Sequence, residues 1–153
     1  MSLAGSLREA GYAPNIIDGA LEPDYRRRVA EQIEDCDCFG VSLLTGPMIL
    51  DAIEMSRLVK SIRPELPVVF GGWHPSLLTG QTLREEFVDI VVRHQGDVTL
   101  VEILERLQAG KPLDLVQGCW FKRAGRIIQN PDRPPVKLAS LPAPAYDLID
   151  FDA

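Results

Sequence analysis

The sequence contains few of the residues that build metal or disulfide sites. Its 153 residues include two histidines and three cysteines. An odd number of cysteines without secretory features indicates free thiols in a reducing cytoplasm. Cys36 and Cys38 are one residue apart, but two thiolates with no nearby histidine do not complete a tetrahedral metal shell. We therefore expect buried thiols, no metal ligands and, since no C-x-x-x-C-x-x-C motif is present, no iron–sulfur cluster.

Long apolar runs and an excess of basic residues are also missing. No apolar run is long enough to span a bilayer, and the start does not have the form of a signal peptide, so we expect a cytoplasmic protein without a membrane partner. The net charge of -6 argues against nucleic acid as a partner. The sequence offers no nucleophile–base pair, so it predicts no catalytic residue and leaves open whether the chain belongs to an enzyme.

What the sequence does contain is an alternation of apolar strands and amphipathic helices up to residue 112. The predicted strands are 15–18, 38–44, 68–71 and 88–92, and the predicted helices are 3–10, 24–34, 50–62, 82–87 and 97–107. Alternation of this kind is typical of right-handed βαβ units. It predicts an α/β fold of the Rossmann-like (flavodoxin-like) type, with a parallel sheet flanked by helices.

The pattern changes after residue 112. Residues 118–122 and 126–129 flank a glycine-containing turn, which predicts a β-hairpin. Five prolines in fourteen residues then predict an extended tail without regular elements. We divide the chain into an α/β domain (1–112), a β-hairpin extension (113–130) and a proline-rich linker toward a further domain (131–153).

Two strand ends form the candidate ligand site. The strand 68–71 ends in Gly71 and Gly72, which either form a tight turn or let a flat ligand approach the backbone. Pro75 makes a helix through His74 unfavourable and favours a turn. The strand before it ends in small and hydroxyl residues, and a parallel sheet would bring the two ends to one edge, where open α/β sheets bind ligands.

Several segments resemble the cobalamin-binding domain of cobalamin-dependent radical S-adenosylmethionine (SAM) enzymes, such as the anaerobic magnesium-protoporphyrin IX monomethyl ester cyclase. The matching segments are Ser42-Leu43-Leu44, Phe70-Gly71-Gly72-Trp73-His74-Pro75-Ser76, Val88-Asp89-Ile90-Val91-Val92-Arg93 and Leu141-Pro142-Ala143-Pro144-Ala145-Tyr146. The resemblance covers nearly the whole chain. It implies a module that holds cobalamin for methyl or radical chemistry by a radical SAM domain, in cis or in trans.

The resemblance also implies the residues that would contact the cofactor. They are Ser42, Leu44, Thr45, Gly71, Gly72, Trp73, His74, Gln95 and Gly96. The nucleotide tail would lie beside the hydroxyls of Ser42 and Thr45, and the two glycines would leave room for it. A cobalt ligand from this chain would have to be His74 or His94, but we expect His74 to cap its turn, so no metal ligand is assigned.

The chain departs from the family pattern in three places. The family's Gly-Glu-Gly-Glu loop is here His94-Gln95-Gly96-Asp97, and no cluster cysteines follow the tail. The family's first strand would precede Met1, which predicts an unpaired edge beside the strand 38–44. We expect either a homodimer or an inward shift of 15–18 to cover that edge. We also expect cobalamin binding to be weak or absent without the first strand.

Three functions remain open at this point. The first is the cobalamin-binding module. The second is a flavodoxin-like or receiver-like domain, although the phosphate loop of the former and the acidic cluster of the latter are missing. The third is a truncated remnant that keeps the fold and has lost the ligand.

Overall fold

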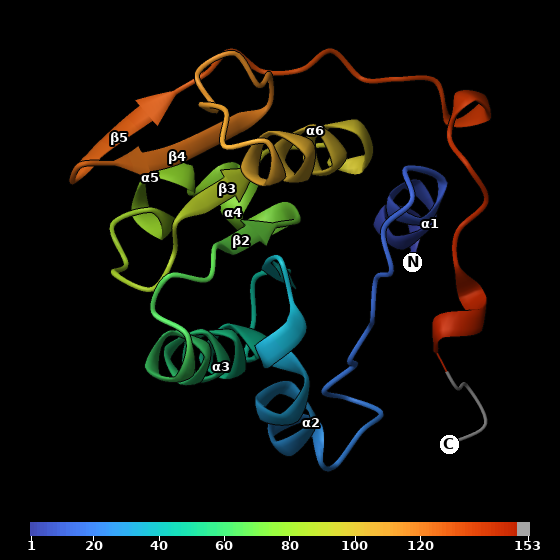
Figure 1. Cartoon of the computed structure of the whole chain (residues 1–153), viewed down its shortest axis with the longest axis vertical. Coiled ribbons are helices and arrows are strands. Elements are labelled where there is room, and N and C mark those ends of the chain that lie inside the picture. The colour runs from blue at the N-terminus through green and yellow to red at the C-terminus, as the bar shows by residue number, and fades with distance from the viewer. Residues whose placement is uncertain (150–153) are drawn as a thin grey trace.

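The computed structural model describes residues 1–149, and these form a single five-stranded sheet with helices on both faces (Figure 1). The strands are β1 (Phe39–Ser42), β2 (Val68–Gly71), β3 (Ile90–Val92), β4 (Cys119–Arg123) and β5 (Arg126–Gln129). They lie side by side in the order β1-β2-β3-β4-β5. The first three strands are parallel, and β4 and β5 are added antiparallel as the predicted hairpin.

The helices cover the sheet as two outer layers, one on each face. They are α1 (Ser2–Glu9), α2 (Tyr25–Gln32), α3 (Met48–Ile62), α4 (Trp73–Leu77), α5 (Thr79–Thr82) and α6 (Asp97–Gln108), with 3-10 turns at Ile33–Asp35, Leu138–Ser140 and Tyr146–Leu148. In Figure 1, α6 lies on one side of β2 and β3 and α3 lies on the other. The predicted Rossmann-like α/β fold is therefore confirmed.

The core follows from the alternation of side chains along β2 and β3. Val68 and Phe70 face the layer of α2 and α3, whereas Val69 faces α6. All three side chains are at most 3% exposed. A strand buried on both faces reads as an unbroken apolar run, and this is why the segment before Gly71 stands out in the sequence. None of the helices in residues 1–149 is long and apolar enough to cross a bilayer.

One predicted strand is wrong. Residues 15–18 form no strand in the structure, and β1 is the edge strand of the sheet. A strand needs a hydrogen-bonded neighbour, and the segment has not moved inward to pair with β1. The predicted unpaired edge beside 38–44 is present.

The prediction for the segment after Gly72 is also wrong. His74 and Pro75 lie inside α4, because a proline in the first turn of a helix loses no hydrogen bond. The predicted capping box at Thr82 is absent, since α5 ends at that residue. The Thr82 hydroxyl donates to the carbonyl of Leu78 at 3.0 Å and so closes a helical turn instead of opening one.

The proline-rich tail does not leave the domain within the described residues. It passes along α1, where the amide of Ala145 donates to the carbonyl of Met1 at 3.2 Å and Arg8 forms an ion pair with Asp147 at 2.8 Å. The backbone of Ala143 is so close to Gly5 that a Cβ at residue 5 would collide with the Ala143 carbonyl oxygen. The predicted linker 131–153 therefore packs on the domain as far as it is described, and residues 150–153 lie outside the described residues.

Gly5→Ala should release this tail contact. Alanine would raise the helix propensity of α1 by about 1 kcal/mol, but the clash with Ala143 forces the tail away and removes that gain. We expect faster proteolysis in the segment 138–149 and no increase in the free energy of unfolding measured in urea.

The matched control is Gly80→Ala. A Cβ at this helical glycine meets nothing within 4 Å, so the substitution should be neutral or stabilising and leave proteolysis of the tail unchanged. Equal behaviour of the two variants would show that the tail does not depend on Gly5.

Candidate functional site

The carboxyl ends of β1 and β2 are fastened to each other by main-chain hydrogen bonds. Ser42 is paired with Gly71 in the register of the two strands. The amide of Leu43 donates to the carbonyl of Gly71 at 2.9 Å, and the amide of His74 donates back to the carbonyl of Leu43 at 3.3 Å. The two strand ends that the sequence analysis selected are therefore direct neighbours.

Residue 72 must be glycine because the backbone just after β1 passes close to it, and no open space lies beside it. Its φ is 94°, a conformation that favours glycine. A Cβ at this residue would lie 2.6 Å from the carbonyl oxygen of Leu43 and 2.9 Å from its amide nitrogen. The two glycines were expected to leave room for the nucleotide tail, but the space beside Gly72 is filled by the backbone of Leu43, so a larger residue there would disturb the fold. At Gly71 a Cβ would make ordinary contacts, with the nearest atom, the carbonyl oxygen of Val92, at 3.7 Å.

Hydroxyl side chains connect this point to the ends of all three parallel strands. The Thr45 hydroxyl and Nδ1 of His74 are 3.1 Å apart, so the imidazole contacts the loop after β1 and does not cap its own turn. Ser76 donates to the carbonyl of Gly72 at 2.7 Å and accepts from the amide of His94 at 2.8 Å. No role was predicted for Ser76 from the sequence, although it lies within the segment Phe70-Gly71-Gly72-Trp73-His74-Pro75-Ser76.

Apolar side chains are exposed around these strand ends. Leu44 is 60% exposed, and Trp73 and Leu77 on α4 are each 65% exposed. Met48 and Leu50, at the start of α3, are exposed as well. Clustered exposed apolar side chains of this kind mark a surface that another molecule covers. Together with the small residues at Ser42 and Gly71, they leave a broad apolar edge with hydroxyl donors.

The loop after β3 is less open than expected. The side-chain oxygen of Gln95 accepts a hydrogen bond from the main-chain amide of Val136 at 2.8 Å. The Gln95 side chain is therefore bound to the tail. A Cβ at Gly96 would lie 3.1 Å from Leu3 and from Val92, which shows that α1 covers this glycine. The candidate residues thus divide into a group around β1 and β2 and a covered pair, Gln95 and Gly96.

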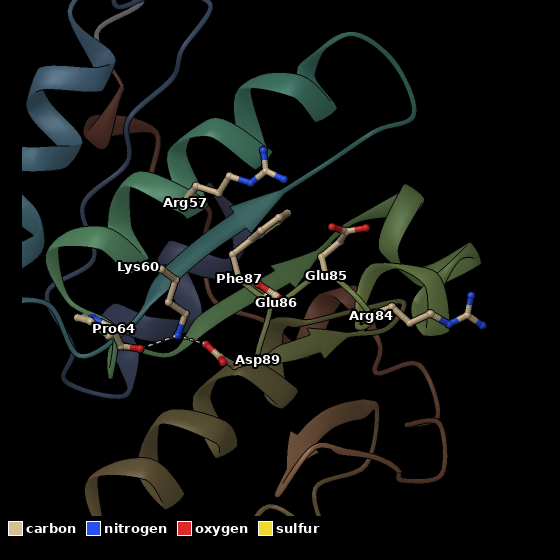
Figure 2. Close-up of a pocket in the computed structure, with 8 residues that line it drawn as sticks. All are labelled: Arg57, Lys60, Pro64, Arg84, Glu85, Glu86, Phe87 and Asp89. Carbon is tan, nitrogen blue, oxygen red and sulfur yellow. Dashed lines mark hydrogen bonds and ion pairs between the residues drawn. The ribbon is translucent and has the colours of Figure 1, made fainter.

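A hollow lies at the opposite end of the strands (Figure 2). It has a volume of about 580 Å³ and is lined by Arg57, Lys60, Pro64, Arg84, Glu85, Glu86, Phe87 and Asp89. Lys60 pairs with Asp89 at 2.6 Å, and Asp89 also accepts from the amide of Val68 at 2.8 Å. The Arg57 guanidinium lies 5.4 Å from the centre of the Phe87 ring. These contacts join α3 to the starts of β2 and β3, so we assign the hollow a structural role.

The described residues contain no group of three or more histidine, cysteine or acidic side chains that could hold a metal ion. Cys36 and Cys38 are half-buried, and Cys119 is buried. Burial raises the pKa of Cys38 and of Cys119 to about 12, which keeps both thiols protonated near neutral pH.

Comparison with known families agrees with this geometry. The B12-binding domain model matches residues 1–104, about two thirds of the chain. The chain belongs to the B12-binding domain family. The cofactor of this family is cobalamin, and the flavodoxin-like and receiver-like alternatives are thereby set aside.

Two curated relatives align along almost the whole chain. An uncharacterized methyltransferase of Pyrococcus horikoshii is 32% identical over 98% of this chain and 33% of its own length. The anaerobic magnesium-protoporphyrin IX monomethyl ester cyclase of Rubrivivax gelatinosus is 25% identical over 98% of this chain and 28% of its own. The chain thus spans about a third or less of these relatives.

Solved structures show the same fold. The radical SAM methyltransferase TsrM of Kitasatospora setae, with cobalamin and a [4Fe-4S] cluster bound, superposes with a TM-score of 0.76 at 16% identity over 94% of this chain and 28% of TsrM. The cobalamin-dependent SAM radical enzyme OxsB superposes with a TM-score of 0.76 at 20% identity over 96% of this chain and 21% of OxsB. The B12-binding domain described here therefore shares its fold with part of each of these two enzymes.

The residues at the ends of β1 and β2 fit such a cofactor. A corrin ring is wide and largely apolar and carries amide arms at its edge. The exposed side chains of Leu44 and Trp73 can cover apolar area, and the hydroxyls of Ser42 and Thr45 can bond polar groups. Gly71, which has no side chain, leaves the end of β2 unobstructed between these residues.

Gly72→Ala should destabilise the whole domain. The left-handed φ and the close approach to Leu43 together predict a loss of roughly 2–4 kcal/mol in the free energy of unfolding. Urea denaturation followed by circular dichroism measures this loss.

Gly71→Ala is the matched control for this measurement. Its Cβ has room beside Val92, so the free energy of unfolding should change by less than about 0.5 kcal/mol. If Gly72→Ala were as stable as Gly71→Ala, the contact between Gly72 and Leu43 would not support the fold.

Proposed function

We propose that this domain binds cobalamin across the carboxyl ends of β1, β2 and β3 and presents it to a radical SAM domain. The observation that carries the proposal is the pairing of Ser42 with Gly71 at the carboxyl ends of β1 and β2, next to the exposed side chains of Leu44 and Trp73. It combines small residues, hydroxyl donors and apolar area where open α/β sheets bind ligands.

Each side chain of this edge has a proposed part in binding. Ser42 and Thr45 donate hydrogen bonds to the polar arms or the nucleotide tail, and Leu44 and Trp73 pack against the macrocycle and exclude water. His74 is oriented by Thr45 and lies beside the cofactor. Gln95 and Gly96 have a supporting part and do not contact the cofactor directly, since the tail covers Gln95 and α1 covers Gly96. When bound, cobalamin supplies the cobalt centre for methyl or radical chemistry by the partner domain.

The partner, the reaction and the compartment are part of the same proposal. The curated relatives are named a methyltransferase and a cyclase, and this chain covers 33% and 28% of their lengths. We propose that a radical SAM domain acts with this module in cis or in trans, in methyl transfer or in a reaction of the magnesium-protoporphyrin cyclase type. Three free cysteines agree with a cytoplasmic setting. A homodimer through β1 stays a prediction.

A domain that keeps this fold without binding cobalamin is the competing reading. The covered positions of Gln95 and Gly96 favour it, because they reduce the number of contacts available to the cofactor. A titration separates the two readings.

Leu44→Asp and Trp73→Ala should weaken cobalamin binding at least tenfold without loss of stability. Both side chains are mostly exposed, so their loss removes contact area with the macrocycle and hardly affects the core. Titration with hydroxocobalamin, followed by its visible spectrum and by gel filtration, gives the dissociation constants.

Leu138→Asp is the control for these two variants. Leu138 is 80% exposed but lies on the tail, so binding should match the unaltered protein. Equal affinity of Leu44→Asp, Trp73→Ala and Leu138→Asp would refute the site, and the absence of any binding would favour the domain that has lost its ligand.

A further inference from the structure

A second hollow lies between α1, α6 and the tail. α1 packs against α6, and the tail passes along α1 (Figure 1). The hollow has a volume of about 260 Å³, far more than the roughly 15 Å³ that a single ordered water needs. Its lining residues are Ser6, Glu9, Ala10, Asp97, Val98, Val101, Ser140, Leu141 and Pro142. None of them belongs to the proposed cofactor edge at β1 and β2.

Two polar side chains that line this hollow are more than nine-tenths buried. Asp97 is 7% exposed and Ser6 is 8% exposed. The Ser6 hydroxyl has no hydrogen-bond partner within residues 1–149. Oδ1 of Asp97 accepts from the Ser2 hydroxyl, whereas Oδ2 accepts from no described residue. A buried polar atom without a partner lowers stability, so both side chains favour a ligand that carries hydrogen-bond donors.

The hollow also carries negative charge that no described cation balances. Glu9 and Asp97 form no ion pair with another residue of the described part of the chain. Arg8, which precedes Glu9, is paired with Asp147 at 2.8 Å. Two carboxylates at one hollow attract a cation, and burial of Asp97 strengthens that attraction because less water screens it.

The rest of the wall is apolar. Val98 and Val101 contribute from α6, and Leu141 and Pro142 contribute from the tail. Val98 is 37% exposed, so this wall reaches the surface. A hydrated inorganic cation gains nothing from apolar side chains, whereas an alkyl chain that covers them removes apolar area from water. The wall therefore favours an organic cation.

We propose that this hollow binds a primary alkylammonium group. An ammonium group has three N–H donors, and the hollow supplies three acceptors, namely the carboxylates of Asp97 and Glu9 and the hydroxyl of Ser6. The alkyl chain lies along Val98 and Val101 toward solvent. The site is independent of cobalamin, because it lies between two helices and the tail and not at the ends of β1 and β2.

The same chemical group occurs in a free alkylamine and in a lysine side chain of another polypeptide. Two probes distinguish these sources. n-Butylammonium represents the free amine, and Nα-acetyl-lysine N-methylamide represents lysine within a polypeptide. Both outcomes support the site. Tighter binding of n-butylammonium assigns it to a small amine, and equal or tighter binding of the lysine derivative assigns it to a lysine side chain.

An NMR titration of the full chain at pH 7, in a buffer without amines, tests the proposal. Saturable shifts of the amide signals of Ser6, Asp97 and Val101 should appear with n-butylammonium chloride. The dissociation constant should be millimolar, because so small a ligand has few atoms that contribute to affinity. Potassium chloride at the same ionic strength and n-butanol at the same concentration should leave these signals unchanged.

Two substitutions remove the acceptors one at a time. Asp97→Asn removes the charge and keeps the shape of the side chain, so affinity should fall at least tenfold. Ser6→Ala removes the unpartnered hydroxyl, so affinity should fall at least threefold. The free energy of unfolding of Ser6→Ala should not decrease, because the hydroxyl makes no bond and alanine favours the helix.

Glu34→Gln and Ser61→Ala are the matched controls. They make the same kind of change at exposed positions on other elements, the 3-10 turn Ile33–Asp35 and α3. Both should bind n-butylammonium like the unaltered protein. Circular dichroism checks that all four variants are folded.

Three results would overturn the proposal. The first is the absence of saturable shifts at Ser6 and Asp97. The second is an equal response to potassium or to n-butanol, which would identify an inorganic cation site or a merely apolar groove. The third is unchanged affinity in both Asp97→Asn and Ser6→Ala. None of these measurements requires cobalamin, so failure here is distinct from failure of the proposed cofactor site.

Discussion

The close approach of two backbones at Gly72 is the constraint on which the rest of this structure depends. Because Gly72 has no side chain, the carbonyl of Leu43 can reach it and the amide of His74 can bond that carbonyl. This contact fixes β1 beside β2 at the end where the small and hydroxyl residues gather. Ser76 then extends the same connection to the loop after β3 through the amide of His94. The candidate cofactor edge is therefore held by main-chain geometry, and its exposed side chains are free to serve binding.

The sequence predicted the sheet well where burial alone decides the structure. Val68, Val69 and Phe70 form an apolar run because both faces of β2 are covered, and local periodicity is enough to find such a strand. The hairpin was predictable for a similar reason, since Gly125 has a positive φ in the turn between β4 and β5. The adjacency of Ser42 and Gly71 followed from parallel connectivity.

The parts that sequence reasoning missed depend on partners far away in the chain. Residues 15–18 have strand-forming composition, but a strand exists only beside another strand, and β1 does not reach them. The open space expected at Gly72 is filled by Leu43, which lies twenty-nine positions earlier. The prolines predicted an extended tail, but its contact with α1 at Gly5 depends on residues far away in the chain. Local patterns carry no information about such contacts.

The ion pair between Lys60 and Asp89 has a consequence for which substitutions the domain can accept during evolution. It secures the starts of β2 and β3, whereas the cofactor edge lies at their carboxyl ends, about 10 Å away along strands that rise roughly 3.3 Å per residue. Free-energy effects of substitutions at that separation are close to additive when the sites share no partners. Stability lost through a new ligand-contacting residue at one end can therefore be recovered by independent substitutions at the other. This separation lets the residues at the carboxyl ends of the strands change with the chemistry while the contacts that stabilise the fold at the other end stay the same.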